Sequence, residues 1–196
     1  HTNPSFPDPG HMAEIEGLPH RFGPLPALTA LNLNVAKGAV LGFLGPNGAG
    51  KSTTMKMITG FLTPSAGRVR VCGHDVERDE IAAKSCIGYL PEGAPAYGDM
   101  TARQFLQFIA QVRGFKAPQA RERIDRVVAR TDLSNVLDQR IETLSKGFKR
   151  RVGLAQAILH DPPVLIMDEP TDGLDPNQKH SVRTLLRTMA AEKAII

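Results

Sequence analysis

The segment Gly45-Pro46-Asn47-Gly48-Ala49-Gly50-Lys51-Ser52 decides the fold class of this chain. It has the spacing Gly-x-x-x-x-Gly-Lys-Ser, which is typical of a phosphate-binding loop. An apolar run at residues 40–44, predicted to be a buried parallel strand, precedes it, and residues 53–61, which have helical spacing, follow it. A strand, a glycine-rich loop and a helix in this order predict an α/β P-loop fold.

The chemistry of such a loop predicts its ligand. Glycines allow successive backbone N–H groups to turn toward one anion, and the N-terminus of the following helix adds its dipole. Lys51 is placed to reach the β- and γ-phosphates, and Ser52 to offer its hydroxyl to Mg²⁺. An ordinary strand-to-helix turn is the alternative, but every fixed position agrees with a nucleoside triphosphate site. The expected nucleotide contacts are Gly45, Pro46, Asn47, Gly48, Ala49, Gly50, Lys51, Ser52 and Thr53.

Two adjacent acids extend this prediction. Residues 164–167 are continuously apolar and end at Asp168-Glu169, so both carboxylates follow a predicted buried parallel strand. Open α/β sheets bind ligands at this end of their strands. Asp168 suits a Mg²⁺ ligand, directly or through water, and Glu169 suits a group that polarises the water attacking the γ-phosphate. Helix capping by these carboxylates is the alternative.

The rest of the chain predicts a mostly parallel core sheet with two additions. Residues 13–40 alternate short apolar and polar pieces, which favours a small N-terminal antiparallel sheet. Residues 68–71 and 87–90 are predicted strands, and residues 101–113 and 120–130 are amphipathic helices that suggest an inserted helical subdomain. Further helices are predicted at residues 145–160 and 181–192, and a strand begins at residue 194.

Composition excludes several functional classes. The net charge of +4 would suit nucleic acid, but the basic residues are scattered. Their densest cluster, at residues 146–151, is interpreted as a solvated helix face without stacking aromatics, so we expect no nucleic-acid partner. Two cysteines, Cys72 and Cys86, form no disulfide framework, which fits a reducing cytosol. No apolar run approaches the roughly 20 residues that span a bilayer.

Later motifs give the chain a family resemblance. Leu144-Ser145-Lys146-Gly147-Phe148 stands about twenty residues before the paired acids, and Tyr89-Leu90-Pro91, Asp168-Glu169-Pro170-Thr171 and Gly173-Leu174-Asp175-Pro176 occur in the same order as in the ATP-binding cassettes of ABC transporters. The chain resembles that family from residue 13 to residue 196. The resemblance implies an ATP-hydrolysing subunit that powers a membrane transporter.

The resemblance also implies partners and further site residues. Ser145 and Gly147 would contact the γ-phosphate of ATP held by a second cassette in a head-to-tail dimer. Asp175 would lie at that interface, and Phe22 would stack on adenine, with core packing as the alternative. A membrane-spanning permease subunit would dock near the Glu92 loop. The subunit would therefore be soluble when isolated and peripheral on the cytoplasmic side of the cell membrane.

Three positions depart from the family pattern. Glu92 stands where most members have Gln in the loop that senses Mg²⁺ and water, and Lys146 and Phe148 replace Gly and Gln. These residues resemble a bacterial exporter-type subgroup, so we expect export and retain Glu92 as a nucleotide and Mg²⁺ contact. A non-transport or regulatory cassette acting on a soluble partner is the alternative function.

The two ends give further expectations. Residues 1–12 begin without Met and carry prolines without periodicity, so they are interpreted as a disordered cloning remnant. Residues 13–196 are expected to be one truncated cassette, with a nucleotide-binding core at 13–90 and 161–196 and a helical subdomain at 91–160. The family's histidine after the last strand lies beyond Ile196, so we expect this chain to bind nucleotide but hydrolyse it poorly.

Overall fold

The computed structural model describes residues 11–19, 30–42, 50–93, 97–171 and 173–196. Its contacts divide the chain into two units. Unit 1 comprises residues 1–87, 163–166 and 190–196, and unit 2 comprises residues 88–162 and 167–189.

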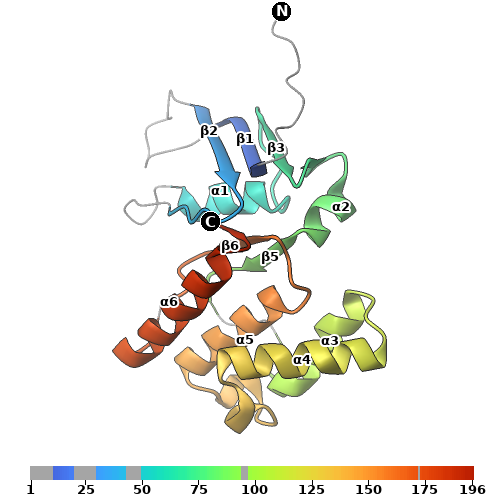
Figure 1. Ribbon diagram of the computed structural model, residues 1–196, viewed down its shortest axis with the longest axis vertical. Coiled ribbons are helices and arrows are strands. Elements are labelled where there is room, and N and C mark those ends of the chain that lie inside the picture. The colour runs from blue at the N-terminus through green and yellow to red at the C-terminus, as the bar shows by residue number, and fades with distance from the viewer. Residues whose placement is uncertain (1–10, 20–29, 43–49, 94–96, 172) are drawn as a thin grey trace, which may run out of the picture. The chain divides into compact units, whose positions relative to one another are not determined.

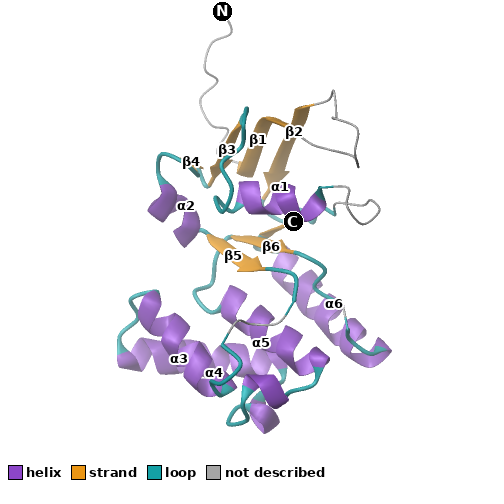
Figure 2. Cartoon of the chain, turned by 180° about the vertical axis from the view of Figure 1, so that it is seen from behind, coloured by secondary structure: helices purple, strands orange, loops and turns teal. Residues whose placement is uncertain are grey.

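Unit 1 contains the predicted antiparallel sheet, with strand order β2-β1-β3-β4. Its strands are β1 (His11–Pro19), β2 (Ala30–Ala36), β3 (Arg68–Val71) and β4 (His74–Asp75). Figure 1 labels β1, β2 and β3, and Figure 2 also labels β4. Alternation fixes the buried face, because Ala13 and Ile15 of β1 are fully buried and pair with Val71 and Val69 of β3. The small antiparallel sheet is therefore confirmed, and β3 has the predicted bounds.

Two helices belong to unit 1: α1 (Lys51–Ile58) and α2 (Glu80–Ser85). Helix α1 was expected at residues 53–61, but it begins two residues earlier and ends three residues earlier. It ends at Gly60, which has a left-handed φ of 73°, so that Phe61 N–H donates to the Lys56 carbonyl (2.8 Å) and Gly60 N–H to the Met57 carbonyl (3.1 Å). Helix α2 was not predicted from the sequence.

A second sheet has the order β5-β6-β7. Its strands are β5 (Ile87–Leu90), β6 (Val164–Met167) and β7 (Ala194–Ile195). Strands β6 and β7 are parallel. Strands β5 and β6 also pair in parallel, because Val164 N–H donates to the Cys86 carbonyl (3.1 Å) and Asp168 N–H donates to the Leu90 carbonyl (2.8 Å). The bounds of β5 and β6 were predicted correctly, and the parallel core is confirmed.

The predicted buried strand at residues 40–44 differs from the structure. Among its described residues, Val40 forms only an isolated parallel bridge with Ile195, and Val40 is 65% exposed. The ladder is short because its partner β7 has only two residues. The remaining residues of this stretch, 43 and 44, lie outside the described part of the chain.

Unit 2 is helical. Its α-helices are α3 (Ala102–Val112), α4 (Ala117–Thr131), α5 (Lys146–Ile158) and α6 (Pro176–Ala190), and its short 3-10 helices are η1 (Ser134–Val136) and η2 (Ile141–Thr143). Helices α3, α4 and α5 pack against one another (Figure 2). Their shared core includes Leu106, Val127 and Leu154, each at most 2% exposed. In the described parts of both units, no helix is long and apolar enough to cross a membrane.

Burial within α5 overturns one interpretation of the sequence. The basic cluster at residues 146–151 was expected to form a solvated helix face, but Arg150 and Arg151 are only 5% and 8% exposed. Lys146 is exposed and Lys149 is half-buried, so only the two arginines depart from the expectation; they begin the part of α5 whose following turns, residues 152–159, are largely buried. Such buried guanidinium groups require acceptors within the protein.

Candidate nucleotide-binding site

The start of α1 carries the described part of the predicted P-loop. Gly50 caps the helix in a left-handed conformation (φ 84°, ψ 10°), where glycine pays no β-carbon penalty. No side chain caps this end, and the first turn contains no acidic residue. Lys51 stands at the first helical position instead, next to the positive end of the helix dipole. The helix N-terminus and the lysine both carry positive charge, so this end is suited to a phosphate.

Some of the other predicted nucleotide contacts are described by the structure and some are not. Ser52 is half-buried and Thr53 is exposed in the first turn of α1. Phe22 and the predicted contacts from Gly45 to Ala49 lie outside the described residues, and their roles stay predictions.

The predicted acidic pair follows β6 in unit 2. Asp168 is 4% exposed, whereas Glu169 is exposed. Glu169 also has a left-handed φ of 49°, which is strained for a residue with a β-carbon. Burial and the nearby Asp168 carboxylate raise the pKa of Tyr89 on β5, with burial as the larger cause. The two acids therefore have different surroundings, as their different predicted roles require.

Arg150 joins this acidic pair to the loop that carries Glu92. Its guanidinium donates to the backbone carbonyls of Asp168 and Glu169, the latter at 2.8 Å. It also donates to the carbonyls of Pro91 and Gly93, the latter at 3.2 Å. Glu92 itself is exposed between those two carbonyls. One buried cation thus connects two segments about 75 residues apart in the sequence.

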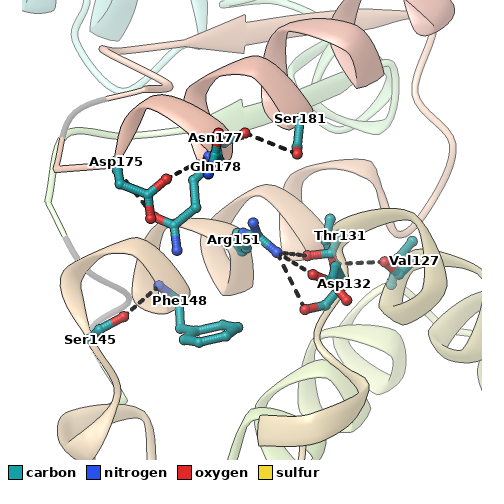
Figure 3. Close-up of polar contacts among 10 residues, drawn as sticks. All are labelled: Val127, Thr131, Asp132, Ser145, Phe148, Arg151, Asp175, Asn177, Gln178 and Ser181. Carbon is teal, nitrogen blue, oxygen red and sulfur yellow. Dashed lines mark hydrogen bonds and ion pairs between the residues drawn. The ribbon is translucent and has the colours of Figure 1, made fainter.

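The predicted signature residues lie at the start of α5. Ser145 is the N-cap, and its hydroxyl accepts a hydrogen bond from Phe148 N–H at 3.3 Å, as Figure 3 shows. Gly147 is buried, and a β-carbon on it would lie 2.5 Å from Gln178 Oε1. These residues therefore have structural duties, helix capping and close packing, beside the predicted contact with ATP.

Asp175 has a structural duty as well. It precedes α6, accepts a hydrogen bond from Gln178 N–H (2.8 Å) and donates its own N–H to Gln178 Oε1 (3.3 Å) (Figure 3). This reciprocal pair is a capping arrangement with Pro176 at the first helical position. It explains why α6 begins five residues before the predicted start at residue 181.

The predicted site residues are divided between the two units. Within unit 2, Glu92, Asp168 and Glu169 share the Arg150 link, and Gly147 contacts the α6 start near Asp175. Gly50, Lys51, Ser52 and Thr53 belong to unit 1. Sequence reasoning missed Arg150. The apolar turns that follow it in α5 were the available signal that this arginine is buried.

Comparison with known proteins agrees with this geometry. A family model described as ABC transporter matches residues 28–172. The chain is 37% identical over 183 residues to the Nod factor export ATP-binding protein I of Paraburkholderia xenovorans, covering 93% of this chain and 60% of that protein. It is 38% identical over 175 residues to the daunorubicin resistance ATP-binding protein DrrA3 of Streptomyces coeruleorubidus, covering 89% of this chain and 55% of that protein.

The chain thus spans less than two thirds of these relatives' lengths. A solved structure of an ATP-binding subunit of an ABC transporter superposes with a TM-score of 0.82 at 28% identity, covering 94% of this chain and 77% of that one. A dimeric bacterial ABC transporter cassette, MJ0796, superposes with a TM-score of 0.80 at 21% identity, which shows the shared fold alone. With a family model that matches most of its length, this chain belongs to the ABC transporter family of nucleotide-binding proteins.

Proposed function

We propose that this chain is the ATP-binding and ATP-hydrolysing part of a membrane exporter. The observation that carries the proposal is the start of α1, where Lys51 follows a left-handed Gly50 at a helix end without an acid in its first turn. The names of the relatives, a Nod factor export protein and a daunorubicin resistance protein, support export as the direction.

The residues present fit a complex of ATP with Mg²⁺. Mg²⁺ prefers oxygen ligands, and in nucleotide sites it binds to a few protein groups together with the phosphates. We propose Ser52, Asp168 and Glu92 as those groups, and the described residues hold no larger cluster of acids, His or Cys that would make an all-protein metal cage. When bound, Mg²⁺ would offset the charge of the phosphates.

Catalysis would then depend on positioning and charge. Lys51 would neutralise the β- and γ-phosphates, and the exposed carboxylate of Glu169 would orient and polarise the attacking water. Gly50, Thr53 and the P-loop residues Gly45, Pro46, Asn47, Gly48 and Ala49 would hold the phosphates, and Phe22 the adenine. Ser145, Gly147 and Asp175 would act across a head-to-tail dimer of cassettes.

A membrane-spanning permease subunit is the proposed partner, and it would hold the cassette at the cytoplasmic side of the membrane. We propose one cassette, with the nucleotide-binding core at 13–90 and 161–196 and the helical subdomain at 91–160. The alternative function is a non-transport or regulatory cassette acting on a soluble partner. ATP binding without hydrolysis would favour it.

Equilibrium binding and turnover together test the proposal. Isothermal titration with ATP, with and without Mg²⁺, is expected to show saturable binding that Mg²⁺ strengthens. Glu169→Gln is expected to keep that binding and abolish the slow single-turnover hydrolysis expected with the native residue. Binding without any Mg²⁺ dependence would remove the proposed metal site. Equal turnover in both proteins would remove Glu169 from catalysis.

A further inference from the structure

Arg150 is the most constrained cation in the described part of unit 2. It lies on α5, is 5% exposed and donates to four backbone carbonyls. Two of these carbonyls, those of Pro91 and Gly93, flank Glu92, and the other two belong to Asp168 and Glu169. A planar guanidinium with donors on both terminal nitrogens suits this geometry, because one nitrogen serves each segment.

The packing of α5 places Arg150 there. Gly153 lies one turn later in the same helix, and a β-carbon on it would lie 2.8 Å from Leu90 Cδ1 of β5. The missing side chain therefore lets α5 approach β5 closely. Leu90 in turn accepts the Asp168 N–H at 2.8 Å, which anchors the end of β6 beside the end of β5. The Arg150 link continues this pairing past the ends of both strands.

The linked backbone includes the strained residue of the site. Glu169 holds a φ of 49°, a strained conformation that persists only when its surroundings enforce it. Arg150 binds the carbonyl of that residue at 2.8 Å and the carbonyl just before it. Charged donors of this kind make hydrogen bonds about twice as strong as neutral ones. The guanidinium is therefore placed to hold the peptide that sets the direction of the Glu169 side chain.

We propose that Arg150 is a positioning residue that fixes Glu169 for water activation and ties its position to that of the Glu92 loop. It touches neither ATP nor water in this role. It acts through four carbonyls, so that displacement of the Glu92 loop is transmitted to the Glu169 peptide. The inference rests on the proposed function in assigning Glu169 to catalysis, whereas the link itself does not depend on that assignment.

Arg151 supplies a matched control. It is the next residue of the same helix and is similarly buried, at 8% exposed. Its guanidinium, however, binds the Asp132 carboxylate (2.9 Å) at the C-terminal end of α4, and it lies 5.6 Å from the centre of the Phe148 ring (Figure 3). Loss of either arginine removes a buried cation, but only loss of Arg150 removes the link between the Glu92 loop and the acidic pair.

The test compares Arg150→Gln, Arg150→Lys and Arg151→Gln in two measurements. The first is amide hydrogen exchange of the whole chain. Arg150→Gln is expected to raise exchange about tenfold or more at the amides of residues 90, 92, 93, 168 and 169, with those of α4 unchanged. Arg151→Gln is expected to raise exchange at the C-terminal end of α4 and to leave the Glu92 loop and the acidic pair unchanged. Arg150→Lys, which keeps the charge and the aliphatic stem, is expected to fall between Arg150→Gln and the native chain and serves where Arg150→Gln does not fold.

The second measurement separates binding from turnover. A misplacement of about 1 Å costs on the order of 100-fold in rate, so Arg150→Gln is expected to lower single-turnover hydrolysis by about that factor and leave the Kd for ATP within about threefold. Arg151→Gln is expected to change neither by more than about threefold. Exchange that rises equally throughout unit 2, or a rate loss shared by both glutamine variants, would overturn the proposal.

The proposed function and the positioning role of Arg150 can be refuted independently. If the native chain binds no ATP, the proposed function fails while the exchange pattern still decides whether Arg150 links the two segments. If the native chain binds and hydrolyses ATP and Arg150→Gln matches it in both measurements, the proposed function stands and the positioning role is refuted.

Discussion

The starts of α1 and α6 show two opposite ways to begin a helix. Helix α6 satisfies its own end, because Asp175 and Gln178 exchange hydrogen bonds and an acid lies beside the positive end of the dipole. Helix α1 has no side-chain cap, no acid in its first turn and a lysine at the first helical position. The α6 start is thus stabilised by its own side chains, whereas we propose that the α1 start serves to bind a phosphate.

The largest expected effect concerns Lys51. A charge-assisted hydrogen bond is worth about 1.5–3 kcal/mol, so Lys51→Ala is expected to raise the Kd for ATP by about 10- to 150-fold. Isothermal titration of the native chain and the variant measures this change. Lys56→Ala, in the last turn of the same helix, is the control that should leave the Kd unchanged.

Gly147 tests the packing between the starts of α5 and α6. Its β-carbon would lie 2.5 Å from Gln178 Oε1, so Gly147→Ala is expected to destabilise the fold by about 1–3 kcal/mol through overpacking. Adding Gln178→Ala should restore part of that loss, because it removes the colliding atom. Urea unfolding of the two single variants and the double variant gives the coupling energy. Additive losses would show that the contact is not the cause.

Asp175 tests whether the α6 start is self-sufficient. Asp175→Ala removes a cap and is expected to cost about 1 kcal/mol in unfolding free energy. Asp175→Asn should cost much less, since Asn caps equally well. Neither change should alter the Kd of the isolated chain for ATP. A loss of ATP affinity as large as that of Lys51→Ala would erase the distinction between the two helix starts.

The smallest expected effect concerns Ser145. Ser145→Asn keeps the cap of α5, so its unfolding free energy should stay within about 0.5 kcal/mol of the native value. Any loss of ATP-driven self-association in this variant, measured by light scattering, then reports on the proposed contact with a second cassette. A stability loss similar to that of Ser145→Ala would show that Asn fails to cap this helix.

The sequence predicted the elements whose pattern is local. The bounds of β3, β5 and β6 follow from short apolar runs bounded by turns, and α3 follows from its amphipathic spacing. The structure adds a capping box of Thr101 and Gln104 that sequence reasoning had not used. The family and the α/β class followed from the order of motifs. Predictions failed where a local pattern had two meanings. The last helix was predicted to start at residue 181, although Pro176 after Asp175 also suits a first helical position and α6 begins there.

Burial was harder to predict than secondary structure. A run of basic residues in α5 resembles a solvated face, and only tertiary packing decides that Arg150 and Arg151 are turned inward to carbonyl acceptors. Val40 shows the converse, since an apolar residue expected in the core is 65% exposed. The predicted roles of the individual site residues stay predictions, because they concern ligands and partners and not the chain's own contacts.

Backbone amide NMR during an ATP titration tests the central claim most directly. With Mg²⁺ present, the amide resonances of Gly50, Lys51, Ser52 and Thr53 are expected to shift in a saturable manner with one Kd. Those at the start of α6, Asp175 to Lys179, should stay in place in the monomer. Saturable shifts at the α6 start with none at the α1 start, or no shifts at either, would contradict the assignment of the α1 start as the nucleotide site.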